Sequence, residues 1–148
     1  MKNNLTSDVY LLIVERMADA MIYSDREGLI RGWNAAAEAL FGYAKDEAIG
    51  QSLDLIIPER LRDPHWVGFN RAMASGATKH AGRATVTRSL TRSRGTIYVE
   101  MSFAVVGDSE GQVLGSVAVA RDATQRQQKD RELRERLETL EKLNSSAI

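Results

Sequence analysis

Three β-prone segments in the second half of the chain restrict its possible folds most. In residues 97–106 apolar side chains alternate with polar or small ones, which is the period of a strand with one buried face. Residues 83–91 and 114–121 flank this segment. The glycine-containing turns between the three segments are short, and short turns join antiparallel neighbours. We therefore predict an antiparallel sheet.

The first half of the chain alternates β-prone and helix-prone segments. Two short β-prone runs around a tetrapeptide that ends in glycine are typical of a hairpin. The expected elements are strands at 20–24 and 29–33 and short helices at 35–41, capped by Asn34, and at 44–49. Two strands, a helical insert and three strands predict an α+β domain, with one five-stranded antiparallel sheet and helices on one face.

The insert also contains a longer helix. Asp63 is a good cap, and Pro64 would occupy the first helical position, where its missing N–H costs nothing. The helix is expected to end at Ser75, because Gly76 favours a stop.

A helix is also expected at residues 7–17, capped by Ser7 or Asp8. Its core-facing stripe would consist of Val9, Leu12, Ile13 and Met17. Three further apolar residues widen the stripe, namely Tyr10, Leu11 and Val14. The helix either lies on its own domain alone or also buries a face in a second subunit.

The composition changes after Asp122, where residues rich in Arg, Glu, Gln and Lys carry a narrow apolar stripe. The stripe consists of Leu133, Leu137 and Leu140. Such spacing on a charged helix is typical of a coiled coil, and a solvated single helix is the alternative. We divide the chain into an N-terminal helix (1–18), a central domain (19–122) and a projecting helix (123–148).

Composition and charge exclude several classes of protein. The chain has no cysteine, so disulfides, thiolate metal sites and cysteinyl cofactor adducts are excluded. Its 20 basic residues balance 20 acidic ones, so no net field attracts nucleic acid or a membrane. The longest apolar run, at 10–14, is too short to span a bilayer, and no signal peptide is visible. We expect a cytoplasmic protein.

The sequence favours neither a nucleic-acid-binding protein nor an enzyme. Arg88, Arg92 and Arg94 lack the aromatic platform of single-strand binders, and we expect them at a solvated sheet edge. No nucleophile elbow or glycine-rich phosphate loop is present.

Four stretches of the chain resemble the PAS sensor domains. They are residues 19–38, residues 40–43 with 48–51, residues 56–60, and residues 118–124, which combine the end of the last predicted strand with an Asp122-Ala123-Thr124 exit. The resemblance covers residues 8 to 125. It implies a cavity between a cupped sheet and the long helix, dimers through the N-terminal helix, and output through a C-terminal coiled coil. Asp122 and Thr124 would hold the signal exit, and a kinase, cyclase or transcription regulator would receive the signal.

His65 is the main cofactor candidate. Gly68 and Phe69 share its helical face, and a position near the helix N-terminus would keep the ring neutral, as a metal requires. The surrounding pattern resembles the haem-binding PAS domains of oxygen-sensing kinases and phosphodiesterases. That resemblance implies haem b with His65 as iron ligand and Arg71 at a propionate, and an apolar far side made by Met101 and Phe103.

The chain also departs from those haem sensors. Thr85 stands where they place an arginine that stabilises bound oxygen, although Arg83 precedes it on the same predicted strand face. Trp66 is not typical of them. A haem-free PAS module, used for dimerisation, relay or binding of a small organic ligand, is the alternative. His80 is a weaker candidate for a propionate contact. A flavin bound through a cysteine adduct is excluded.

Overall fold

Five strands form one antiparallel sheet in the order β2-β1-β5-β4-β3. The computed structural model describes residues 4–79 and 81–147. The strands are β1 (Ala20–Asp25), β2 (Ile30–Trp33), β3 (Thr85–Thr91), β4 (Gly95–Gly107) and β5 (Val113–Asp122). The first and last strands pair at the centre of the sheet, and β3 forms an edge. The predicted α+β fold with a single five-stranded sheet is confirmed.

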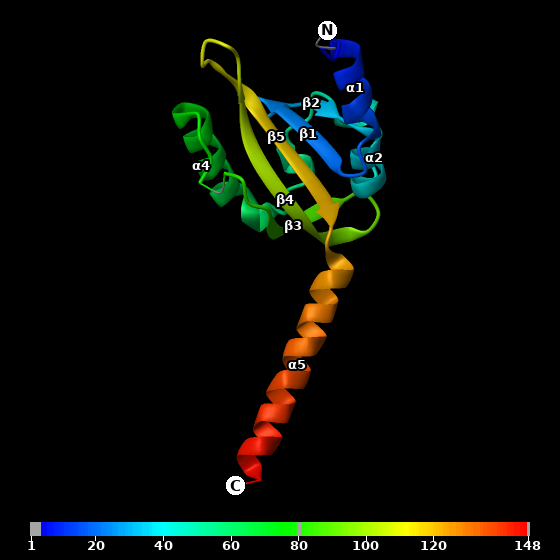
Figure 1. The fold of residues 1–148 in the computed structure, drawn as a ribbon, viewed down its shortest axis with the longest axis vertical. Helices are drawn as coiled ribbons and strands as arrows, with labels where there is room; N and C mark the ends of the chain where they lie inside the picture. The colour runs from blue at the N-terminus through cyan, green and yellow to red at the C-terminus, as the bar shows by residue number, and fades with distance from the viewer. Residues whose placement is uncertain (1–3, 80, 148) are drawn as a thin grey trace.

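The helices lie before, between and after the two groups of strands. They are α1 (Ser7–Arg16), α2 (Ala35–Phe41), α3 (Lys45–Ala48), the 3₁₀ helix η1 (Leu53–Leu55), α4 (Glu59–Ser75) and α5 (Thr124–Ser146). Helix α5 extends away from the sheet and carries the C-terminus far from it (Figure 1).

The core fills the space between one face of the sheet and the inserted helices. Residues that alternate along β4, such as Val99 and Met101, are buried on this inner face, as the two-residue period predicted. Trp33 packs against Phe41 of α2 with ring centroids 5.3 Å apart. Phe69 of α4 belongs to the same apolar cluster, so one core supports both the sheet and α4.

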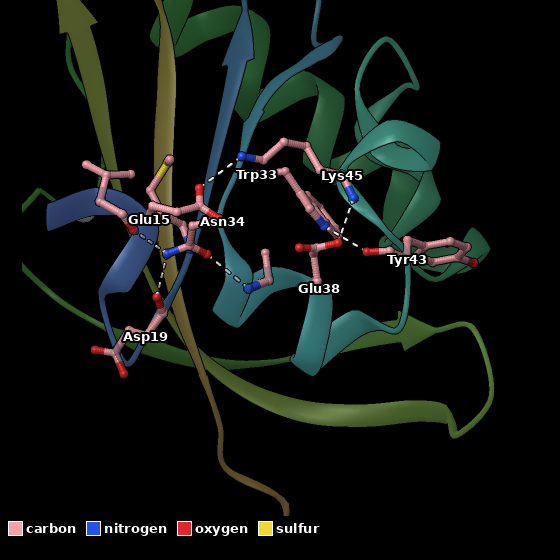
Figure 2. Close-up of polar contacts among 10 residues, drawn as sticks. Glu15, Asp19, Trp33, Asn34, Glu38, Tyr43 and Lys45 are labelled. Carbon is pink, nitrogen blue, oxygen red and sulfur yellow. Dashed lines mark hydrogen bonds and ion pairs between the residues drawn. The ribbon is translucent and has the colours of Figure 1, made fainter. Parts of the chain in front are cut away.

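Asn34 joins three elements with one side chain, as Figure 2 shows. Its Oδ1 accepts hydrogen bonds from the backbone N–H groups of Ala37 (3.0 Å) and Met21 (2.9 Å). Its Nδ2 donates to the carbonyls of Val14 (2.9 Å) and Asp19 (3.0 Å). The predicted cap of α2 is confirmed, and the same residue ties the end of α1 to the sheet.

Helix α1 differs from its prediction in its cap and in its burial. Thr6 caps it, rather than Ser7 or Asp8. None of residues 7–16, all of which the structure describes, is buried. Three residues predicted to face the core are exposed, namely Val9, Leu12 and Ile13. Val14, predicted to face a partner, is partly buried at the end that Asn34 holds. The polar contacts between described residues of α1 and the domain lie at this end, at Val14 and Glu15.

Helix α4 begins at Glu59, earlier than the predicted start at Asp63, and Pro64 lies inside it. Pro58 precedes the first turn, and the side chain of Arg62 donates to the carbonyl of Ile57 (3.1 Å). These groups stabilise a turn before Pro64. Pro64 itself is exposed, where water can reach the carbonyl that its missing N–H leaves unpaired. The predicted end at Ser75 is confirmed, with Gly76 in a left-handed conformation (φ 76°).

Helix α5 begins two residues after Asp122 and stands free of the domain over most of its length. None of residues 124–146, all within the described chain, is buried. The three seam residues Leu133, Leu137 and Leu140 are between 57% and 63% exposed. The coiled coil and the division at 1–18, 19–122 and 123–148 stay predictions.

Candidate functional site

A cavity of about 550 Å³ lies between α4, the loop that follows it, and the inner face of the sheet. Its volume falls within the range of small-molecule and cofactor sites. Phe69 and Ala72 of α4 form one apolar wall, and Phe103 and Val105 of β4 form the other. The cavity therefore stands where the fold separates α4 from β4.

All seven residues that the sequence singled out for a cofactor border this cavity. They are His65, Phe69, Arg71, Arg83, Thr85, Met101 and Phe103. Thr85 and Met101 are paired across β3 and β4. Arg83 lies in the loop before β3 rather than on the strand, so the predicted shared strand face is wrong. The roles of these residues stay predictions. His80 lies outside the described residues.

His65 is half-buried in the cavity wall, between two aromatic rings. Its ring stacks on Phe69 with centroids 5.9 Å apart, and Trp66 meets it edge-on at 4.8 Å. The Nδ1 atom is buried and has no hydrogen-bond partner among the described residues. One ring nitrogen of a histidine in an apolar wall is thus left without a protein partner.

Burial keeps the ring neutral. Removal from water lowers the pKa of His65 below its ordinary 6.5, and the carboxylate of Asp54 opposes the shift. The sequence predicted that the helix dipole would keep the ring neutral, but burial is the cause. Because α4 begins at Glu59, His65 lies beyond the first turn, where the dipole has its effect.

Three cationic side chains, Arg71, Lys79 and Arg83, stand at the exposed rim of the cavity. Within the part of the chain that the structure describes, none of the three forms an ion pair. Carboxylates are the partners such groups prefer, so the rim can bind an anionic end of a molecule.

Trp66 holds α4 in place and was not assigned a role from the sequence. Its Nε1 donates to Oδ1 of Asp54 (2.8 Å), which is the second residue of η1. Its ring also covers the β1–β2 turn so closely that a Cβ on Gly28 would lie 2.2 Å from it. Gly28 has φ 80°, so this turn needs glycine for its backbone and for the approach of Trp66.

The junction of β5 and α5 is built around Asp122 and Thr124. Oδ1 of Asp122 accepts from the N–H of Thr124 (2.9 Å), and Oδ2 accepts from Arg94 (3.0 Å). Partial burial raises the pKa of Asp122, but these hydrogen bonds lower it more, so the net shift is downward. The N–H of Tyr98 on β4 donates to Oγ1 of Thr124 (3.3 Å). The predicted exit thus contacts β4 directly.

Further contacts connect the outer face of β4 to α5. Arg126 donates to Oε2 of Glu100 (3.0 Å), and Arg131 donates to the hydroxyl of Tyr98 (3.5 Å). Glu100 and Met101 are neighbours on β4, and Met101 borders the cavity. A shift of this strand would therefore act on α5 as well as on the cavity.

The three strand-edge arginines have separate partners. Arg88 donates to the hydroxyl of Tyr98 (3.2 Å), Arg92 pairs with Glu47, and Arg94 pairs with Asp122. They are exposed along the β3 edge and its turn, as predicted.

Residues 4–79 and 81–147 contain neither a membrane-spanning helix nor a cluster of metal ligands. No helix there combines the length and apolar character that crossing a membrane requires. No three His, Cys, Asp or Glu side chains in these residues lie close enough together to hold a metal ion.

The chain is similar to known sensor proteins. The family model described as PAS fold matches residues 10–123. Sensor protein FixL of Bradyrhizobium diazoefficiens is 37% identical over 73 residues, which cover 40% of this chain and 14% of that protein. Oxygen sensor protein DosP of Escherichia coli is 24% identical over 122 residues, which cover 82% of this chain and 15% of that protein. The chain thus spans about one seventh of the length of these curated relatives.

Solved structures agree on the fold. The PAS domain of a protein from Colwellia psychrerythraea matches with a TM-score of 0.70 and 21% identity, covering 80% of this chain and 97% of that one. An identity this low supports the fold alone.

Proposed function

The chain belongs to the PAS family, and on that premise we propose that it is a sensory domain that binds haem b through His65 and relays a gas or redox signal along α5. The chain would itself be regulatory rather than catalytic. A kinase, cyclase or transcription-regulator domain would receive the signal, because the relatives are several times longer than this chain.

The observation that carries the proposal is the imidazole of His65 in an apolar wall. The lowered pKa keeps the ring neutral at pH 7, and a neutral imidazole is the form that binds iron. Nδ1 has no partner among the described residues, so no hydrogen bond to a protein group holds the ring in another role. The residues present therefore fit an iron ligand.

The remainder of the cavity suits the other parts of haem. Phe69, Met101 and Phe103 provide apolar surface for a macrocycle, and Arg71 and Arg83 can pair with its carboxylates. Thr85 offers a hydroxyl where related sensors have an arginine. When bound, haem would supply reversible binding of a diatomic gas or a change of redox state.

Strand β4 is the proposed route of the signal. Met101 borders the cavity, while Tyr98 and Glu100 contact Arg131 and Arg126 of α5. A displacement of β4 would change these contacts and the exit at Asp122 and Thr124. The exposed seam Leu133, Leu137 and Leu140 would pass the change to a second copy of the chain in a coiled coil, and Tyr10 and Leu11 of α1 would extend that homodimer.

Titration of the full chain with haemin tests the cofactor. We expect a sharp Soret band in the wild type and in the His80→Gln control, and loss of that band in His65→Ala. A chain without a band, or with one that His65→Ala leaves unchanged, would contradict haem ligation. The haem-free reading, a relay module or a receptor for a small organic ligand in the same cavity, would then replace it.

A further inference from the structure

A second hollow adjoins the first and is enclosed by more of the core. Its volume is about 320 Å³, and it lies between η1, the start of α4 and the inner face of the sheet. Ile22, Leu53 and Ile56 form its apolar floor, and His65 and Met101 border both hollows. We call it the inner chamber. It is larger than the roughly 150 Å³ cavity that holds benzene in an engineered protein.

A pair of serines places two hydroxyl groups on the otherwise apolar inner face of the central strands. Ser24 of β1 and Ser116 of β5 are paired across the centre of the sheet, and their Oγ atoms lie 3.0 Å apart. Their exposed fractions are only 1% and 5%. Their neighbours on the inner face, Ile22 and Ala118, are apolar. Ser116 borders both hollows and Ser24 borders neither, so Ser116 is the member that reaches the ligand space, from the side opposite α4.

The pair has one hydrogen-bond donor to spare. Two hydroxyls carry two O–H donors, and the bond between them uses one. Neither Oγ has another partner within residues 4–79 and 81–147. A buried donor without a partner costs free energy, and a ligand oxygen that accepts from it recovers that cost.

Close packing of the backbone fixes the positions of the two serines, and when Ser24 donates to Ser116 the spare O–H is that of Ser116. Gly115, next to Ser116, approaches β1 so closely that a Cβ on it would lie 1.9 Å from the carbonyl oxygen of Ser24. The two strands therefore cannot accept a side chain at this point. A hydroxyl pair held on two packed central strands is preorganised, and preorganisation favours selective binding.

The remaining polar residues of β3 around the inner chamber are Ser89 and Arg88, which have partners, and Thr85 and Thr87, whose hydroxyls are uncharged. Ser89 donates to the carbonyl of Ile56 (2.8 Å), and Arg88 is directed to the hydroxyl of Tyr98 (3.2 Å). Burial keeps His65 uncharged. The guanidinium of Arg88 lies over the ring of Tyr98, 5.4 Å from its centroid, on the outer face of the sheet. A charged ligand would thus find no counter-ion inside the inner chamber, in contrast to the cationic rim of the first cavity.

We propose that the inner chamber binds a small neutral organic molecule with one oxygen acceptor, such as a one-ring aromatic ketone, and that the Ser24–Ser116 pair recognises that oxygen. The apolar walls hold the hydrocarbon part, and the spare O–H donates to the oxygen. This site needs neither iron nor the cationic rim, so its test is independent of the test of haem binding by His65.

The test uses the full chain without haem and two probes of similar shape. Acetophenone carries a carbonyl oxygen, whereas ethylbenzene carries none. We expect acetophenone to bind more tightly, as measured by calorimetry and by NMR shifts of residues around the inner chamber. Ser116→Ala should weaken acetophenone by about three- to tenfold and leave ethylbenzene unchanged, which is the loss of one hydrogen bond. Ser24→Ala keeps the O–H of Ser116 and should weaken acetophenone less.

Ser102→Ala is the matched control, since Ser102 lies on β4 but borders neither hollow. It should bind both probes as the wild type does. Circular dichroism would verify that each variant folds, and two separate serine variants guard against failure of one. The proposal is overturned if acetophenone does not bind up to its solubility limit, if the two probes bind alike, or if both serine variants keep the wild-type preference. Because no haem is present, none of these results bears on the Soret experiment.

Discussion

Helix α4 buries Phe69 and Met73 against the sheet and is tied to η1 through Trp66, whereas none of the side chains in residues 124–146, all described, is buried in α5. Both are long helices with charged surfaces. The first has contacts over much of its length. The second contacts the domain only near its start, through Thr124, Arg126 and Arg131.

The difference separates the two tasks of the molecule. The place of α4 is determined within one chain, so the cavity beside it has a defined shape before any ligand enters. Most of α5 makes no buried contact within the chain that would fix its position. The exposed leucine seam needs a partner helix to become buried. Strand β4 is the element that contacts both, with Met101 on one face and Glu100 on the other.

Removal of the Trp66 side chain should have the largest effect on the stability of the domain. Trp66→Ala deletes the ring that covers Gly28 and the hydrogen bond to Asp54. We expect a loss of about 2–4 kcal/mol in the free energy of unfolding, because a large, partly buried ring is replaced by space. Urea denaturation followed by the fluorescence of Trp33 measures it.

Trp66→Phe keeps an aromatic ring at this position. The phenyl ring keeps part of the packing but loses the hydrogen bond to Asp54 and the outer indole atoms over Gly28, so we expect a loss smaller than that of Trp66→Ala. If Trp66→Ala unfolds at the same urea concentration as the wild type, this residue does not hold α4 in place. That result would contradict the proposed difference between α4 and α5.

Much of the fold was predictable because its signals are local. Two-residue alternation in 97–106 located β4, and Asn34 and Gly76 marked helix ends by their own chemistry. The seven cofactor candidates border one cavity because positions three or four apart share a face of α4, and because Thr85 pairs with Met101 across β3 and β4.

The rest depends on contacts between distant segments. The start of α4 was misplaced because Pro64 looks like a first helical residue, while the groups that stabilise the earlier turn lie on Pro58 and Arg62. Trp66 over Gly28 is visible only after folding. The Ser24–Ser116 pair joins residues 92 positions apart, and no spacing in the sequence indicates it. The burial of α1 was overestimated because its periodicity does not reveal which partner the apolar stripe meets.

As the pH is lowered, the titration of His65 at the cavity should reduce the stability of the domain before the titration of Asp122 beside α5 does. In the unfolded chain His65 takes up a proton at its ordinary pKa of 6.5, and in the folded chain burial lowers that pKa. As the pH falls below about 6.5, the unfolded state binds the proton first, so the free energy of unfolding decreases. The effect should be smaller than that of Trp66→Ala. Urea denaturation at a series of pH values measures it.

Two variants and a second pH window sharpen this prediction. His65→Gln should remove the decrease below about 6.5, and His80→Gln should retain it. Asp122, at the junction of β5 and α5, has a pKa below its ordinary 3.8, so the stabilisation it provides should be lost only as the pH falls below that value. An unchanged pH dependence in His65→Gln would show that the ring is not desolvated in the folded chain.

The smallest effect on the domain is expected from the leucines of α5. In a variant with Leu133, Leu137 and Leu140 replaced by alanine, the free energy of unfolding of the dilute chain should change by no more than about 0.5 kcal/mol, because the three side chains are exposed. Sedimentation should nevertheless show a dimer for the wild type and a monomer for the variant. Replacement of Glu135, Glu138 and Lys142 by alanine, on the opposite helix face, is the control and should leave the dimer intact. Alanine favours helix, so neither set removes α5 itself. A wild type that sediments as a monomer at every concentration, or a leucine variant that still dimerises, would mean that α5 does not relay the signal through this seam.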